Sequence, residues 1–234
     1  MEIKRFYAEK GARTGKTFTV TGEEAHHMIK VLRYKKGYKI IIFDGTGYDY
    51  YCTLTELGKD YVVAEIDERV ENDTESKLGI RLYQGITKSD KMDVIVQKAV
   101  ELGVSEITPV ITARSEKEVK LEKLEKVGIS AAKQCGASRL PKINEPVYLS
   151  EIPFDNLVIF AHENEKNRTL RDISLSKFNK VDLLVGAEGG FTEDEGKELV
   201  ERGAVAVSLG KRILRAETAA ITLIGLTLYK AGVI

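Results

Sequence analysis

The chain has 234 residues, of which 43% are hydrophobic and 31% charged, a balance typical of globular proteins rather than disordered or membrane-embedded ones. No apolar run approaches the roughly 20 residues that span a bilayer, and the charged start does not fit a secretory signal, so we expect a cytoplasmic protein without a membrane role. Two cysteines and three histidines argue against a disulfide framework and against a metal site.

Charge is distributed unevenly, although 36 basic and 36 acidic residues cancel. Residues 1–40 hold ten Lys and Arg against four Asp and Glu, whereas residues 41–78 hold three against ten. A basic flank of this kind attracts a phosphate backbone, but a solvated face without a partner is the commoner explanation. Charge alone leaves both interpretations open.

The first 70 residues are predicted to form a small β-barrel. Thr21, with Glu24 three residues later, forms a capping-box signature that predicts a helix continuing to Leu32. Glycine-containing turns separate β-branched and aromatic runs, a pattern typical of antiparallel hairpins. The predicted strands are residues 5–9, 17–20, 38–44, 48–57 and 61–68. Because so few short strands need closure to protect their edges, the pattern favours a barrel.

Residues 71–78 are polar and are predicted to form a linker between two domains. Over residues 79–234 short apolar strands alternate with helices, which is typical of a parallel sheet covered on both faces. The predicted strands are residues 80–85, 106–111, 157–161, 181–185 and 204–209, with helices at 90–102 and 117–134 and after each of the last two strands. We therefore expect an α/β domain here.

Three consecutive strands of this domain are each followed by an unusual loop. The loops are residues 162–164, 186–193 and 210–218. Ligands of parallel sheets bind at the carboxyl ends of the strands, so we expect these loops to build one site. Gly186, Gly189 and Gly190 in the second loop allow a close approach of backbone to a ligand, although a tight turn that needs glycine for steric reasons explains them about as well. The loop matches neither the dinucleotide pattern nor the P-loop pattern.

The third loop concentrates positive charge. Lys211, Arg212 and Arg215 surround Ile213 and Leu214 just before a predicted apolar helix. Arginine binds phosphates with two parallel hydrogen bonds, and the backbone beside the apolar residues can bracket a flat heterocycle. A solvated run of charges remains the alternative.

Two linked motifs carry a resemblance to a known family. Residues 186–195 match the pattern G-P-E-G-G-[FL]-[ST]-x-x-E, and residues 209–219 match L-G-x-R-[IV]-L-R-x-E-T-[AT]. The chain thereby resembles the SPOUT-class methyltransferases of the RsmE type, which use S-adenosylmethionine to methylate N3 of a uridine in small-subunit ribosomal RNA. Ala187 and Lys211 depart from the pattern, since the family usually has proline at both positions.

The resemblance implies a fold and partners. The expected fold is a PUA-like RNA-binding β-barrel over residues 1–70, followed by an α/β domain knotted as a trefoil over residues 79–234. The family acts as a homodimer that packs through the knot domain, so we expect a homodimer with ribosomal RNA as partner. The expected cofactor-binding residues are Phe160, Ala161, His162, Glu163, Gly186, Glu188, Gly189, Gly190, Leu209, Gly210, Ile213, Leu214 and Thr218.

Two residues are candidates for catalysis. Uridine N3 carries a proton and is a poor nucleophile until that proton leaves. We expect Arg215 to stabilise the charge that develops on the base or the adjacent phosphate, and Glu217 either to orient Arg215 or to act as base. An acid at a helix N-terminus is favourable in any case, so Glu217 has a purely structural explanation as well.

RNA contacts are expected from basic residues in both domains. Charge and family position single out Arg5, Arg33, Lys35, Lys36, Lys88, Lys91 and Arg139. Two alternative functions stay open at this point: a methyltransferase of the same class that acts on a ribose 2′-hydroxyl, and a non-catalytic RNA-binding assembly factor.

Overall fold

The computed structural model describes residues 3–74 and 76–234, which form two compact units. The N-terminal unit lies within Met1–Glu75 and also takes Ala132–Leu140, while the C-terminal unit lies within Ser76–Ala131 and Pro141–Ile234. The chain thus changes unit in the segment predicted to be a linker. It differs from the sequence-based division in that residues 132–140 belong to the N-terminal unit.

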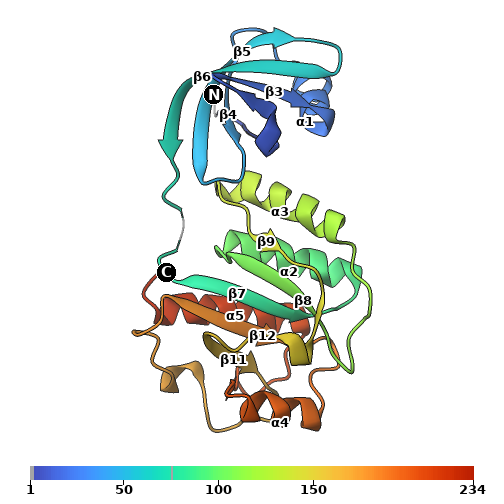
Figure 1. The fold of residues 1–234 in the computed structure, drawn as a ribbon, viewed down its shortest axis with the longest axis vertical. Helices are drawn as coiled ribbons and strands as arrows, with labels where there is room; N and C mark the ends of the chain where they lie inside the picture. Colours follow the sequence, from blue (N-terminus) through green and yellow to red (C-terminus); the bar gives the residue numbers. More distant parts are fainter. Residues whose placement is uncertain (1–2, 75) are drawn as a thin grey trace. The chain divides into compact units, whose positions relative to one another are not determined.

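A six-stranded sheet forms the frame of the N-terminal unit (Figure 1). Its strands are β1 (Arg5–Tyr7), β2 (Arg13–Thr14), β3 (Thr17–Thr21), β4 (Lys39–Phe43), β5 (Tyr48–Leu57) and β6 (Tyr61–Glu71), in the order β1-β4-β5-β6-β3-β2. All neighbours pair antiparallel except β1 and β4, which are parallel. The sequence predicted antiparallel hairpins and missed the parallel pair, because β1 pairs with a strand more than 30 residues away.

Aromatic and β-branched side chains from these strands fill one hydrophobic core. Helix α1 (Gly22–His26) and the π-helical turn His27–Val31 close it, with Ala25 and Met28 fully buried. Thr21 is the N-cap of α1, but its side chain makes no capping hydrogen bond, so the predicted capping box is wrong. Glu24 instead accepts a hydrogen bond from Lys133 Nζ at 2.6 Å. The largest buried side chains of this core are Phe6, Phe18, Met28, Ile40, Ile42, Tyr50 and Leu54.

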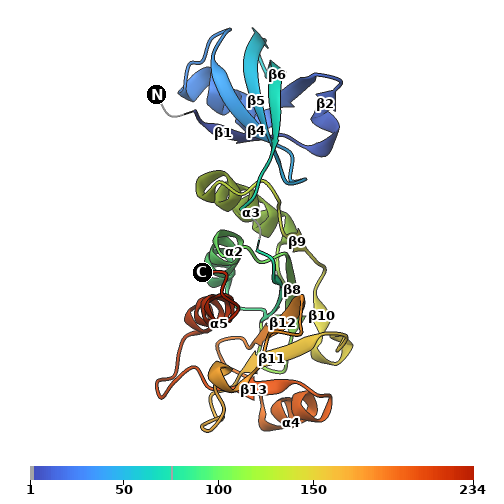
Figure 2. The same cartoon turned by 90° about the vertical axis from the view of Figure 1, so that its left-hand side faces the viewer.

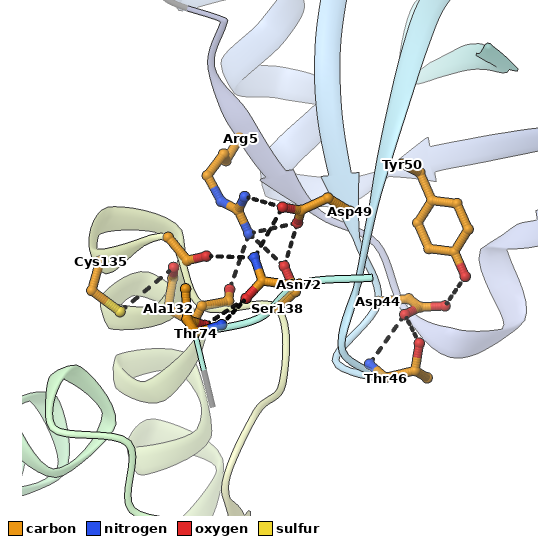
Figure 3. A network of polar contacts seen from close by, with 12 residues as sticks. Arg5, Asp44, Thr46, Asp49, Tyr50, Asn72, Thr74, Ala132, Cys135 and Ser138 are labelled. Carbon is orange, nitrogen blue, oxygen red and sulfur yellow. Dashed lines mark hydrogen bonds and ion pairs between the residues drawn. The ribbon is translucent and has the colours of Figure 1, made fainter. Parts of the chain in front are cut away.

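Residues 132–140 join this unit through a buried polar network centred on Asp49 (Figure 3). Arg5 donates to Asp49 at 3.0 Å and to Ser138 Oγ at 2.7 Å, and the Ser138 hydroxyl donates to Asp49 as well. Asn72 bridges Asp49 and the Gly136 carbonyl at 3.0 and 3.1 Å. Burial would raise the pKa of the Asp49 carboxyl, but the hydrogen bonds from Arg5, Ser138 and Asn72 outweigh burial and lower it.

A parallel sheet forms the centre of the C-terminal unit, which confirms the predicted class. Its strands are β7 (Gly79–Gly85), β8 (Glu106–Ile111), β9 (Lys142–Ile143), β10 (Val147–Tyr148), β11 (Leu157–Ala161), β12 (Lys180–Val185) and β13 (Val205–Val207). The order is β10-β8-β7-β12-β11-β13, with the short β9 on β8. The three strands that precede the predicted site loops, β12, β11 and β13, are therefore neighbours, and their carboxyl ends lie at the same edge.

Helices cover both faces of this sheet. Figure 2 shows α2 (Ser89–Glu101) and α5 (Ala216–Lys230) side by side on one face, where α5 also contacts β12. On the other face α4 (Glu193–Glu201) packs its buried Leu199 against Tyr83, Phe160 and Leu184. Helix α3 (Leu121–Cys135) begins four residues later than predicted. No helix in the described part of the chain is long and apolar enough to cross a membrane.

Candidate active site

The loops that follow β11, β12 and β13 surround one cavity in the C-terminal unit, with a volume of about 130 Å³. Its walls combine glycine backbone, apolar side chains and a few charged groups. The lining residues are Ala161, His162, Glu163, Val185, Gly186, Ala187, Glu188, Gly190, Phe191, Ser208, Leu209, Gly210, Lys211, Arg212, Ile213, Leu214, Ala216 and Ala219. Segments from three separate strands thus come together, as the carboxyl-end rule predicts.

The loop after β12 is held in place from beneath by the end of β7. Gln84 is fully buried, and its Nε2 donates to the Gly186 carbonyl at 3.1 Å. Next to it, a Cβ added to Gly85 would lie only 2.5 Å from the Ala187 amide nitrogen. A side chain at position 85 would therefore push the loop away from the sheet. Neither residue was singled out from the sequence.

A second support comes from the segment after β8. Arg114 Nη1 donates to the Gly189 carbonyl at 2.8 Å, and the Ala113 amide donates to Glu195 at 2.7 Å. Thr192 and Glu195 form a true capping box at the start of α4, with hydrogen bonds of 3.2 and 2.8 Å. Thr192 is thus the N-cap of α4, and the position of Arg114 after a parallel strand is the signal that could have identified this support.

Glu188 lies at the cavity wall and accepts hydrogen bonds from two directions. The Lys88 amide and the Lys91 ammonium both lie 3.2 Å from Glu188 Oε1. Burial would raise the pKa of this carboxyl, but its own amide, the Lys88 amide and the Lys91 ammonium lower it below its ordinary value. Glu188 is therefore a carboxylate near neutral pH and adds negative charge to the cavity.

The loop after β11 contributes one wall. Phe160 is buried and lies beneath the cavity, where its ring contacts the rings of His162 and Phe191 edge to face. The His162 amide donates to the Val207 carbonyl at 3.0 Å, which ties this loop to the end of β13. His162 also packs over α4, since a Cβ on Gly196 would lie 3.1 Å from its Nε2.

The loop after β13 is the most exposed wall. Lys211, Arg212 and Ile213 are exposed, and 84% of Ile213 is accessible, an unusual fraction for an aliphatic side chain. Arg215 is the N-cap of α5, has an extended backbone and makes no side-chain cap. The guanidinium of Arg215 makes no hydrogen bond or ion pair with any described residue, so it is available to a ligand.

The structure separates the predicted site residues into two groups. Predicted cofactor residues that line the cavity are Ala161, His162, Glu163, Gly186, Glu188, Gly190, Leu209, Gly210, Ile213 and Leu214. Phe160, Gly189 and Thr218 do not line it, and neither do the predicted catalytic residues Arg215 and Glu217. Ala216 lines the cavity, however, and lies between Arg215 and Glu217 at the start of α5.

Glu217 has an unusual environment. Its side chain is half-buried, and Oε2 is buried without a hydrogen-bond partner among the described residues. No hydrogen bond joins Glu217 to Arg215 within residues 3–74 and 76–234. A buried acceptor without a partner is costly, and a bound water, an ion or a catalytic role can account for one.

The predicted RNA-binding residues also differ in their surroundings. The guanidinium of Arg5 is engaged inside the N-terminal unit by Asp49, Ser138 and the Ala137 carbonyl, and Lys91 is paired with Glu188. The remaining predicted residues, Arg33, Lys35, Lys36, Lys88 and Arg139, have exposed side chains. In the described chain no group of three or more His, Cys, Asp or Glu is arranged to hold a metal ion.

The chain matches two family models. Residues 74–228 match an RNA methyltransferase domain, and residues 20–67 match an RNA methyltransferase PUA domain. The ribosomal RNA small subunit methyltransferase E of Buchnera aphidicola subsp. Schizaphis graminum is 32% identical over 98% of this chain and 97% of its own. This chain belongs to the methyltransferase E family. The family member from Bacillus subtilis is 31% identical over 87% of this chain and 86% of its own.

Solved structures of similar proteins support this family assignment. The Neisseria gonorrhoeae ribosomal RNA small subunit methyltransferase E, bound to S-adenosyl methionine, has a TM-score of 0.88 and 35% identity over 97% of this chain and 98% of its own. A putative methyltransferase from Legionella pneumophila, in complex with the bound cofactor SAM, also has a TM-score of 0.88, with 31% identity over 98% of each chain.

Proposed function

We propose that this protein transfers the methyl group of S-adenosylmethionine to N3 of a uridine in small-subunit ribosomal RNA. The observation that carries the proposal is the cavity built by the loops after β11, β12 and β13, in a chain that is similar over nearly its whole length to methyltransferases solved with this cofactor. The similar proteins are named as ribosomal RNA small subunit methyltransferases, which favours methylation of that RNA over the non-catalytic assembly factor considered from the sequence. The two linked motifs at residues 186–195 and 209–219 support N3 of a uridine over a ribose 2′-hydroxyl.

The cavity fits the cofactor in its chemistry. Val185, Phe191 and Leu214 offer apolar surface for a flat base, and the glycine backbone of the loops after β12 and β13 offers hydrogen-bonding groups close to the wall. Glu163 and Glu188 supply negative charge and Lys211 and Arg212 supply positive charge, which suits a ligand that carries charges of both signs. When bound, S-adenosylmethionine supplies an electrophilic methyl group on a positively charged sulfur.

Arg215 and Glu217 supply the remaining chemistry in this proposal. In this proposal Glu217 accepts the uridine N3 proton; because its Oε2 is buried and Glu217 does not line the cavity, binding of the RNA has to expose this oxygen. The N3–methyl bond then forms as the sulfur–methyl bond breaks, which leaves a neutral thioether. Arg215 stabilises the negative charge on the uracil oxygens or the neighbouring phosphate, since its guanidinium has no other partner in the described chain.

Replacement of Arg215 tests this assignment. Arg215→Ala should lower the methylation rate by at least about 100-fold, because it removes a charge that acts in the transition state, while the affinity for S-adenosylhomocysteine changes less than about twofold. Calorimetry with S-adenosylhomocysteine and mass mapping of small-subunit RNA methylated in vitro measure the two quantities.

Arg215→Lys is the matched control, since it keeps the charge but not the planar donor geometry, and it should recover part of the rate. A large loss of cofactor affinity in Arg215→Ala would contradict the catalytic role. A methyl group mapped to a ribose 2′-oxygen would contradict the proposed product.

We further propose that the C-terminal unit is knotted and forms a homodimer in the cytoplasm. After the edge strand β13 the chain lines the cavity beside the loop that follows β12, and α5 then packs against α2 and β12. This path supports passage of residues 209–216 through the loop that follows β12. A structure with residues 209–216 outside the loop would contradict the knot.

The proposed dimer surface lies on α2 and α5. Exposed Leu226 and Tyr229 on α5 and exposed Val94 on α2 support it.

A further inference from the structure

A concentrated basic segment lies at the surface of the N-terminal unit. Residues 30–39 hold five Lys and Arg and no acidic residue. Lys39 is paired with Asp67 at 2.9 Å. The side chains of Lys30, Arg33, Lys35 and Lys36 are exposed and make no hydrogen bond or ion pair with any described residue, so their charges face solvent without compensation.

Two tyrosines of the same segment are stacked. The rings of Tyr34 and Tyr38 are 5.0 Å apart between centroids and only 15° from parallel. Tyr34 is itself supported by Phe6, whose ring meets it edge to face at 6.1 Å. Tyr38 is 37% exposed, so it is the outer ring of a supported stack, with one face against Tyr34.

The turn that carries these side chains is well defined. The Tyr38 amide donates to the Lys35 carbonyl at 3.2 Å, and Gly37 has a φ of 90° that an L-residue seldom adopts. The Gly37 amide donates to the Leu54 carbonyl at 2.7 Å, which anchors the turn to β5. Lys35, Lys36 and Tyr38 are thus presented by one anchored turn.

Arg33 has a strained backbone. It ends the helical segment with a φ of 53°, and the next amide, that of Tyr34, donates to the Met28 carbonyl at 2.9 Å. Glycine is the usual residue at such a left-handed helix end. Among residues 3–74 and 76–234 no other non-glycine residue has a positive φ. Strain of this kind is commonly retained for a side chain that functions.

We infer that residues 30–38 form a binding site for an unpaired nucleotide of the substrate RNA. A base stacks on the outer face of Tyr38, and Arg33, Lys35 and Lys36 contact the flanking phosphates. Aromatic stacking combined with basic side chains is how proteins hold single-stranded RNA, because every base has a π face and every linkage a negative charge. The inference rests on the proposed function for its RNA substrate but is separate from the methyl-transfer cavity.

Tyr38→Ala tests the stack in the full-length protein. Fluorescence anisotropy with a labelled single-stranded RNA oligonucleotide should show roughly tenfold weaker binding, while Tyr38→Phe binds like wild type. Tyr61→Ala is the matched control, since Tyr61 is also 37% exposed in the same unit, and it should leave affinity unchanged. Affinity of Tyr38→Ala within twofold of wild type, or an equal loss for a duplex of the same sequence, would overturn the stacking site.

Arg33→Gly tests whether the Arg33 side chain binds RNA apart from the strain in its backbone. The thermal midpoint should stay the same or rise, because glycine accepts the left-handed conformation, whereas RNA affinity should fall and the salt dependence of binding should weaken. A lower midpoint with unchanged affinity would make Arg33 merely structural and overturn its role. Methylation of small-subunit RNA by the wild-type protein is measured in parallel. No methylation by the wild-type protein would contradict the proposed function. Methylation by the wild-type protein together with unchanged RNA affinity of Tyr38→Ala would contradict only the nucleotide site.

Discussion

Asp49 shows how one buried residue orders a polar cluster. Its carboxylate receives hydrogen bonds from Arg5, Ser138 and Asn72, which come from three separate segments of the chain. Arg5 was predicted to bind RNA because basic residues near the start of the chain match the family. The Arg5 side chain is only 15% exposed and its guanidinium is engaged within the N-terminal unit, so we expect its loss to affect folding more than RNA affinity.

The Asp49 cluster should make stability depend on pH. In the folded state the pKa of this carboxyl lies below its ordinary value of 3.8. The stabilisation is therefore present above pH 3.8 and is lost as pH falls through the pKa of the folded state. The free energies of unfolding of wild type and Asp49→Asn, measured from thermal melts, should therefore differ most at neutral pH, by about 1–3 kcal/mol, and converge only as pH falls well below 3.8. A difference that grows on acidification would contradict the assignment.

At the scale of elements, the site is a loop supported by a strand end. The Gly186 loop rests on Gln84 and Gly85 at the end of β7, and Arg114 holds it from the side. The carbonyl of Gly186 is fixed by a side chain that is itself fully buried. We infer that the rigidity of the cavity depends on residues that do not line it.

Gly85→Ala should test this dependence. The added Cβ would lie 2.5 Å from the Ala187 amide, so the loop must shift, and affinity for S-adenosylhomocysteine should fall by about tenfold or more. Gly128→Ala in α3 is the matched control, because its Cβ would meet only Val100 at 3.9 Å, and it should leave affinity unchanged. Equal affinity in both variants, measured by calorimetry, would show that the loop does not depend on β7.

Local sequence patterns predicted the strands and loops of this site, but not the side chains that hold the loop after β12 in place. Apolar runs identified β7, β8, β11 and β12, and the motif glycines identified the loop, because both signals are contiguous in sequence. The supports Gln84 and Arg114 escaped because their roles arise from contacts about 75 to 100 residues away. The parallel β1–β4 pair and the place of residues 132–140 escaped for the same reason.

At the scale of the whole molecule, the proposed dimer is the property most open to measurement. Tyr229 is 72% exposed and Leu226 44% exposed on α5, a helix whose Ala220, Leu223, Ile224 and Leu228 are buried. Exposed apolar side chains that cluster on one helix are typical of protein interfaces.

Tyr229→Glu should convert the protein to a monomer in light scattering coupled to size-exclusion chromatography, because a charge in an apolar interface loses its hydration without a partner. Tyr148→Glu is the control, since Tyr148 is 58% exposed elsewhere in the same unit and should leave the mass unchanged. A wild-type protein that elutes as a monomer would contradict the dimer.

The place of residues 132–140 has a practical consequence for dissecting the protein. A gene fragment that stops in the polar segment after β6 would encode every strand of the six-stranded sheet but not Ser138 or Gly136. Arg5, Asp49 and Asn72 would then be left with unmet hydrogen-bonding capacity at a newly uncovered surface. The N-terminal module is therefore discontinuous in sequence, and excising it intact requires a designed fusion that supplies the missing nine residues rather than a single cut.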